Sequence, residues 1–226
     1  MRKLPSFIHT QKAFYVSTSF KVMYSTLSKD GGLAMPRSTR PLLVNTWRAA
    51  LGLRSLPHYL IVRDPYRRLE SFFRDKFRTH PAKSRASGAA DWQACQQIFF
   101  PLLGVTSGSD GPSIRERLLS LAFPDFVREL AHVYRRDRHL LPQVDARFVR
   151  IRGAALGWVQ PTRILRMESA PDLAFLAELL ERDLGTAENA TGDVAVDCGW
   201  NAELRAIANR IYRWDFRLYR YPQICA

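Results

Sequence analysis

Two short apolar runs, each followed by a loop and then a helical pattern, decide which fold classes are open to this chain. The runs at 13–16 (AFYV) and 58–62 (HYLIV) are nearly continuous and rich in β-favouring residues, as buried strands of a parallel sheet are. After the second run, apolar residues recur at helical spacing over 65–77, with basic residues elsewhere on each turn. This succession predicts an α/β fold in which helices flank a central parallel sheet and ligands bind at the strand ends.

Further elements are predicted along the rest of the chain. A third strand is predicted at 162–167, and Ser169 with Asp172 three residues later predicts the capped start of a helix that Gly185 ends. Other helices are expected at 114–121, 125–134 and 201–212, and an extended segment at 219–222.

The segment 80–112 interrupts this pattern, because it is rich in Ser, Gly, Ala and Pro apart from an apolar stretch at 92–103. We interpret it as an irregular or lid-like insertion. No linker of the kind that separates domains is evident, so residues 1–226 are predicted to form a single domain.

The charge balance predicts an anionic partner. The chain has 34 Lys and Arg against 21 Asp and Glu, a formal net charge of +13, which suits nucleic acid, acidic lipid headgroups, a polyanionic glycan or a phosphorylated cofactor. No apolar run of about 18 residues is present, the start of the chain lacks the apolar core of an export signal, and the three cysteines form no CxxC pair. These features predict a cytoplasmic protein without a membrane-spanning helix.

The first segment with phosphate-binding chemistry follows the first predicted strand. At 20–29 (FKVMYSTLSK), successive backbone N–H groups can hold a phosphate, while Lys21 adds positive charge and Ser25 and Thr26 add hydroxyl donors. The segment is not a Walker A motif, because the glycines of GxxxxGK[ST] are missing. From the residues alone, a turn with a solvated lysine is an equally good interpretation.

The second segment follows the second predicted strand and is more specific. In 61–77 (IVRDPYRRLESFFRDKF), Arg63 leaves the strand end and Ser71 lies two turns into the following helix, so both can reach one anion. A guanidinium and a hydroxyl together suit a phosphate monoester. The stretch resembles the 3′-phosphate-binding motif of sulfotransferases, in particular the VRDPxxRLxSxxxxKF pattern of the carbohydrate (family 2 type) branch, as in a bacterial-type member.

The resemblance extends over most of the chain outside 80–112. The segment 21–26 is similar to the family's 5′-phosphosulfate loop, and 137–143 (DRHLLPQ) resembles its DxHxxPQ segment. Similarity also covers 166–168 (RME) and 212–221 (YRWDFRLYRY). The resemblance implies a fold related to P-loop nucleotide kinases. It also implies transfer of a sulfuryl group from 3′-phosphoadenosine 5′-phosphosulfate (PAPS) to a hydroxyl of a carbohydrate, glycolipid or polysaccharide acceptor, with no metal.

The resemblance also implies which residues bind the donor. Sulfuryl transfer parallels phosphoryl transfer, in which catalysis consists of positioning and of neutralising charge on the leaving phosphate. Lys21 is expected to neutralise that charge. Ser25 and Thr26 are expected to bind the 5′ side of the donor, and Arg63 and Ser71 its 3′-phosphate.

A base must take the proton of the acceptor hydroxyl. His139 is the first candidate, because it lies in the DxHxxPQ-like segment and an unperturbed histidine titrates near neutral pH. His58, between the two phosphate-binding segments, and Glu168, after the third predicted strand, are the alternatives. A surface or capping histidine explains His139 equally well from sequence.

Departures from the family's pattern keep other functions open. Relatives have proline before the loop lysine and a small residue after it, whereas this chain has Phe20, Met23 and Tyr24. A loop without glycine does not easily use positive φ angles. A non-catalytic member with this fold, a basic nucleic-acid-binding protein and a small-molecule kinase with a divergent phosphate loop are the alternative functions.

The positive charge also bears on where the protein acts. An enzyme of glycan synthesis at the inner face of a membrane gains from peripheral contact with anionic lipids, although no basic amphipathic helix stands out in the sequence.

Overall fold

The structure is a computed structural model that describes residues 5–19, 22–29, 31–36, 40–151, 154–184 and 198–224. The chain divides into two compact units. The first combines Met1–Asp64, Pro142–Asn189 and Arg217–Tyr221, and the second combines Pro65–Leu141, Ala190–Phe216 and Pro222–Ala226. Each unit thus draws on distant parts of the sequence, and the expectation of a single domain stays a prediction.

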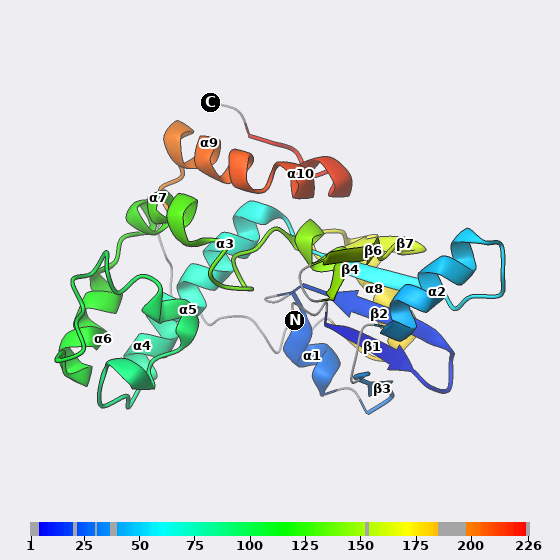
Figure 1. The fold of residues 1–226 in the computed structure, drawn as a ribbon, viewed down its shortest axis with the longest axis horizontal. Helices are drawn as coiled ribbons and strands as arrows, with labels where there is room; N and C mark the ends of the chain where they lie inside the picture. The colour runs from blue at the N-terminus through cyan, green and yellow to red at the C-terminus, as the bar shows by residue number, and fades with distance from the viewer. Residues whose placement is uncertain are drawn as a thin grey trace. The chain divides into compact units, whose positions relative to one another are not determined.

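A five-stranded mixed sheet organises the first unit (Figure 1), with the strand order β3–β1–β2–β4–β7. Strands β2, β4 and β7 pair in parallel, whereas β1 pairs antiparallel with both β2 and β3. The α/β class and the parallel centre are confirmed, and the antiparallel edge is an addition that the sequence pattern did not predict. The strands are β1 (Ser6–His9), β2 (Phe14–Thr18), β3 (Leu33–Ala34), β4 (His58–Val62) and β7 (Arg163–Arg166).

The core of the first unit lies between this sheet and the helices α1 (Tyr24–Ser28) and α8 (Ala170–Leu180). Side chains alternate along a strand, so Phe14 and Val16 of β2 both join this core. The buried cluster consists of Phe7, Phe14, Val16, Val22, Leu27, Ile61, Leu165, Leu176 and Leu180.

Helix α8 begins as predicted and ends earlier. Ser169 Oγ accepts a hydrogen bond from the Asp172 N–H (3.3 Å), which confirms the predicted cap. The helix ends at Leu180, because Glu181 takes the left-handed conformation with φ 50°. The prediction that Gly185 ends it is therefore wrong, and Gly185 itself lies outside the described residues.

Three further elements of the first unit had no sequence prediction. They are the helix α2 (Arg40–Ala50), a 3₁₀-helix at Gln143–Arg147, and the antiparallel hairpin of β5 (Phe148–Ile151) and β6 (Ala154–Trp158).

The second unit is helical in its described residues. Its first helix, α3 (Pro65–Arg74), begins at a proline, as predicted, and continues through a π-helical turn (Asp75–Thr79) into α4 (His80–Lys83). The 80–112 segment therefore opens as helix and also contains two short helical turns. The remaining elements are a 3₁₀-helix (Ala89–Asp91), α5 (Ala94–Gln97), α6 (Gly111–Ser120), α7 (Phe123–Val133) and α9 (Ala202–Ile211).

Helix α10 (Arg213–Tyr219) starts in the second unit and ends in the first. It replaces part of the extended segment predicted at 219–222, because Tyr219 is its last residue.

Closely packed aromatic rings form the core of the second unit. The predicted apolar stripe supplies Phe72 and Phe73 from α3 and Phe77 from the π-helical turn, and all three are almost completely buried. Their rings and those of Phe99 and Phe126 have neighbouring centroids 5.2–6.2 Å apart. Such pairs add stabilisation beyond the burial of apolar area. The interpretation of this stripe as core is therefore confirmed.

Candidate functional site

The side chain of Gln143 fixes the backbone at the carboxyl end of β4. Its Oε1 accepts a hydrogen bond from the Arg63 N–H (3.0 Å), and its Nε2 donates one to the Arg63 carbonyl (2.7 Å). The same Oε1 accepts a hydrogen bond from Ser19 Oγ (3.1 Å), one residue beyond β2. Gln143 and Ser19 are both buried. One side-chain amide thus ties together the ends of two adjacent parallel strands, where ligands bind in open α/β sheets.

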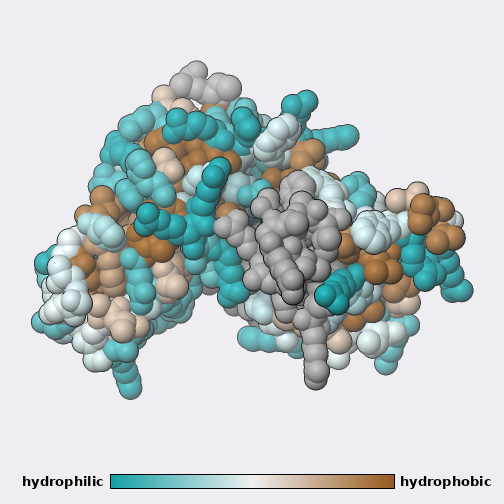
Figure 2. Space-filling model, viewed as in Figure 1, coloured by the Kyte–Doolittle hydropathy of each residue, from teal (hydrophilic) through white to brown (hydrophobic). Residues whose placement is uncertain are grey.

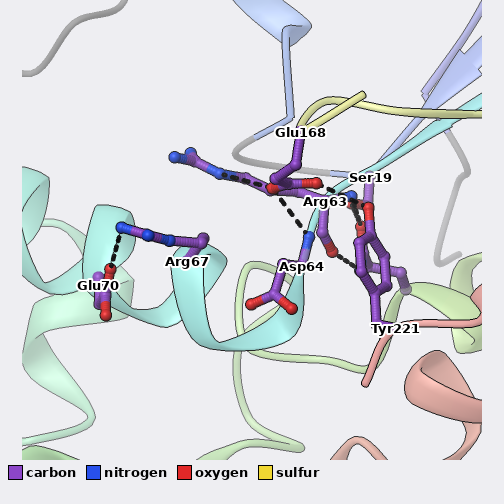
Figure 3. A network of polar contacts seen from close by, with 8 residues as sticks. Ser19, Arg63, Asp64, Arg67, Glu70, Glu168 and Tyr221 are labelled. Carbon is purple, nitrogen blue, oxygen red and sulfur yellow. Dashed lines mark hydrogen bonds and ion pairs between the residues drawn. The ribbon is translucent and has the colours of Figure 1, made fainter. Parts of the chain in front are cut away.

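Glu168, two residues beyond β7, receives hydrogen bonds on both carboxylate oxygens (Figure 3). The Asp64 N–H donates to Oε1 (3.1 Å), and the Tyr221 hydroxyl donates to Oε2 (2.8 Å). Burial, and then the negative charge of Glu168, raise the pKa of Tyr221, so this hydroxyl stays a donor. This geometry fits a carboxylate that orients its neighbours better than it fits a base.

The guanidinium of Arg63 lies at the edge of this network. Its Nε is 3.9 Å from Glu168 Oε1, and 26% of its side chain is exposed. In Figure 3 its terminal nitrogens point away from the carboxylate. A guanidinium offers five N–H donors in a planar fork, a geometry that suits an oxyanion.

Hydrogen bonds connect the end of β2 with the residues just before α1. The Val22 N–H donates to the Ser19 carbonyl (3.2 Å), and Thr18 Oγ1 donates to the Ser19 and Val22 carbonyls. Met23 then adopts a left-handed conformation with φ 50° immediately before α1. A positive φ in this glycine-free loop runs against the prediction from its sequence, and such a backbone is unfavourable for a residue with a Cβ.

The loop residues predicted to bind the donor are only partly described. Lys21 lies outside the described residues, and so does the side chain of Ser25. Thr26 is a half-buried residue within α1.

Ser71 and His139 belong to the second unit, whereas Arg63 belongs to the first. Ser71 is a half-buried residue of α3, and the neighbouring Phe72 ring lies 6.2 Å from the His139 ring. The arginine and serine predicted to share one phosphate are thus divided between the two units.

His139 forms a close pair with Asp137. Its Nδ1 lies 2.7 Å from Asp137 Oδ1, and its backbone N–H donates to the same oxygen at 2.7 Å. Burial favours the neutral acid of Asp137, but the hydrogen bonds from His139 outweigh it and lower the pKa of this carboxyl. With Nδ1–H donating to Asp137, Nε2 is the nitrogen that can accept a proton.

His58, the alternative base, is the first residue of β4 and is 2% exposed. Its Nε2 lies 2.9 Å from Ser17 Oγ. A strand of this length separates it from Arg63 by roughly 16 Å. His58 thus lies at the amino end of β4, opposite the end that carries the Arg63 network. This position suits packing rather than proton transfer.

Burial of His58 makes stability depend on pH. Desolvation lowers its pKa to about 4, from the ordinary value of 6.5. Below pH 6.5 this histidine is protonated in the unfolded chain, whereas in the folded chain it stays neutral down to about pH 4. The free energy of unfolding therefore falls as the pH falls through this range. We expect urea denaturation to show that wild type loses about 2 kcal/mol more than His58→Asn between pH 7 and pH 5. Equal losses in both proteins would contradict this explanation.

A small cavity of about 140 Å³ lies within the predicted insertion. Its lining consists of His80, Lys83, Ser84, Asp91, Trp92, Gln93 and Gln96.

The sequence did not predict the pairing of Gln143 with Arg63 and Ser19, although Gln143 is the last residue of the DxHxxPQ-like segment.

The described part of the chain contains no group of three or more side chains that suits a metal ion. Within the same residues, no helix has both the length and the apolar character needed to cross a bilayer.

Comparisons with protein-family models, with curated proteins and with solved structures found no match to this chain.

Proposed function

We propose that this chain is a sulfotransferase that transfers a sulfuryl group from PAPS to a hydroxyl of a carbohydrate, glycolipid or polysaccharide acceptor. The proposal includes a sulfotransferase fold related to P-loop nucleotide kinases and a cytoplasmic location. The observation that carries it is that four family-like segments meet around one strand end. Arg63, Gln143, Glu168 and Tyr221 come from these segments and form one hydrogen-bonded network at the carboxyl end of β4.

The network supports a binding role for Arg63. Gln143 holds both backbone polar groups of Arg63, and Glu168 receives the next backbone N–H and contacts the guanidinium. A side chain that binds a phosphate gains affinity when its backbone is fixed in advance, because less conformational freedom is lost on binding. We assign the 3′-phosphate of the donor to this guanidinium. The assignment of Ser71 to the same phosphate rests on the resemblance and stays a prediction.

In the proposed reaction, the bond between sulfur and the 5′-phosphate oxygen breaks as a bond between sulfur and the acceptor oxygen forms. The acceptor hydroxyl loses its proton to a base, and adenosine 3′,5′-bisphosphate leaves. His139 is our candidate for the base, because it lies in the DxHxxPQ-like segment and its pair with Asp137 orients the ring. Lys21, Ser25 and Thr26 keep the roles that the resemblance implies, and no step requires a metal.

Calorimetric titration with adenosine 3′,5′-bisphosphate tests the donor site. We expect micromolar binding by wild type and about 10- to 100-fold weaker binding by Arg63→Ala, because charge-assisted hydrogen bonds to phosphate are lost. ATP is the control ligand. Arg67→Ala is the matched control, since it removes the same charge four residues later from a side chain that is 69% exposed.

Failure to bind by wild type would overturn the proposal and favour the nucleic-acid alternative, which salt-dependent retention on DNA would then test. Equally weakened binding in Arg63→Ala and Arg67→Ala would mean that the ligand responds only to the general positive charge of the protein. Binding without sulfuryl transfer to any acceptor in a screen with labelled PAPS would identify a non-catalytic member.

A further inference from the structure

Helix α2 of the first unit buries one side and exposes apolar residues on the other. Leu42 and Leu43 are buried, whereas Val44 and Trp47 are each 51% exposed. Because residues three and four apart share a helix face, Val44, Trp47 and Leu51 lie along one outward stripe. An exposed stripe of this kind indicates an interaction surface.

The turn after α2 extends this stripe and has a defined conformation. Gly52 has φ 68°, the Leu53 N–H donates to the Arg48 carbonyl (2.8 Å), and the Gly52 N–H donates to the Ala49 carbonyl (3.1 Å). These two bonds form a Schellman motif, in which glycine accepts the left-handed conformation. Leu51 is 74% exposed and Leu53 is 54% exposed. The turn thus presents two leucines to solvent from an ordered backbone.

Side-chain hydrogen bonds from α2 to the residues after this turn stabilise its conformation. Arg48 Nε donates to the Arg54 carbonyl (2.8 Å). Asn45 accepts a hydrogen bond from the Leu56 N–H (2.7 Å) and donates one to the Leu56 carbonyl (2.9 Å). The exposed leucines therefore cannot fold back onto α2 without breaking these bonds. Figure 2 shows the resulting brown surface at the end of α2, at the right edge of the view.

The segment that contains α2 and its turn is basic, and Arg48 and Arg54 in it are exposed. Residues 31–63 contain five arginines and no Asp or Glu. Trp47 Nε1 lies 3.5 Å from the position that a Cβ on Gly157 would take, so α2 packs against β6. The β5–β6 hairpin belongs to a second stretch, 146–167, that also has five arginines and no acidic residue. Arg147 of this stretch is buried and Arg163 pairs with Asp172 (3.0 Å), so the exposed charge beside the turn comes from Arg48 and Arg54. This composition is complementary to an anionic surface.

We propose that the outer face of α2 and its Schellman turn dock on an anionic phospholipid bilayer. Trp47, Leu51 and Leu53 enter the boundary between headgroups and acyl chains, and Arg48 and Arg54 contact lipid phosphates. Apolar residues that include tryptophan, with arginines beside them, are characteristic of helices that lie in this interface.

Two other occupants fit less well. Nucleic acid is bound through phosphate contacts and base stacking, which gives no role to two exposed leucines. A second copy on the same face would bring arginines against arginines, since a two-fold dimer pairs a surface with itself.

Co-sedimentation with vesicles tests this proposal. The probes are phosphatidylcholine vesicles with and without phosphatidylglycerol. We expect wild type to bind only the anionic vesicles, and Leu51→Glu to bind them at least tenfold more weakly, because a charged group cannot enter the acyl boundary. Leu102→Glu, at another exposed leucine in the second unit, is the matched control and should bind as wild type does. Both positions are exposed, so neither change should lower the melting temperature.

Several results would overturn the proposal. Wild-type affinity in Leu51→Glu would mean that charge alone holds the protein at the surface. Equal losses in both glutamate variants would mean that added negative charge anywhere has this effect. A wild-type dimer in sedimentation velocity that Leu51→Glu dissociates, without vesicle binding by either protein, would assign the face to a second copy.

Discussion

Replacing Arg68 by alanine is expected to lower the free energy of unfolding by about 3–5 kcal/mol. Arg68 is 2% exposed, and its Nη2 donates to the Leu141 carbonyl at 2.5 Å. Its guanidinium carbon lies 5.2 Å from the centre of the Tyr212 ring, and the Tyr212 hydroxyl donates to the Leu140 carbonyl (2.7 Å). Alanine would leave a cavity and an unpaired buried carbonyl. Urea denaturation measures the change.

Arg67→Ala is the control for this substitution. The neighbouring side chain is 69% exposed and forms an ion pair with Glu70 at 3.7 Å (Figure 3). We expect a change within about 0.5 kcal/mol, as for most exposed ion pairs. A comparable effect in both variants would contradict the structural role of Arg68. The two arginines of the family-like pattern would otherwise have separate functions, Arg68 in holding the helix and Arg63 in binding.

Replacing Gln143 by alanine is expected to lower the free energy of unfolding by about 3 kcal/mol, since three hydrogen bonds among buried groups contribute about 1 kcal/mol each. The Arg63 N–H, its carbonyl and the Ser19 hydroxyl all lose their partner. Gln11→Ala, on an exposed turn, is the control and should change stability little.

The same variant links stability to the proposed function. If Gln143 positions Arg63, then Gln143→Ala should also weaken binding of adenosine 3′,5′-bisphosphate, measured below the unfolding transition. Loss of stability with unchanged binding would show that Gln143 supports only the fold.

The sequence predicts an element well where a single pattern dominates. The continuous run at 58–62 coincides with β4, and the apolar stripe that starts at Pro65 coincides with α3. In both cases most of the buried residues are apolar, with His58 and Arg68 as the exceptions, so local pattern and tertiary packing largely agree.

Helix α2 escaped prediction because its pattern is mixed. It buries Asn45 and Thr46 and exposes Val44 and Trp47, so polar and apolar residues do not separate by face. The buried polar groups are satisfied locally, Asn45 by Leu56 and Thr46 by the Leu42 carbonyl. Buried polar residues and exposed apolar residues on one helix are consistent with a helix that uses its outer face for an interaction.

The candidate site was predictable in its residue types and unpredictable in its contacts. Arg63 and Glu168 were singled out from their places after strands. The amide of Gln143 reaches Arg63 across 80 positions of sequence, and no local pattern specifies such a pair. Met23 shows the converse, because it has a positive φ that the preference of a residue with a Cβ opposes.

The π-helical turn at Asp75–Thr79 determines where this helix tolerates a change of length. A π-turn holds one residue more than an α-turn needs, so loss of a residue there leaves an ordinary α-helix and keeps the flanking residues on their faces. A deletion within Pro65–Arg74 would instead rotate every later side chain by about 100° and turn Phe77 out of the aromatic core. Insertions and deletions in related chains should therefore concentrate at this one turn of the helix.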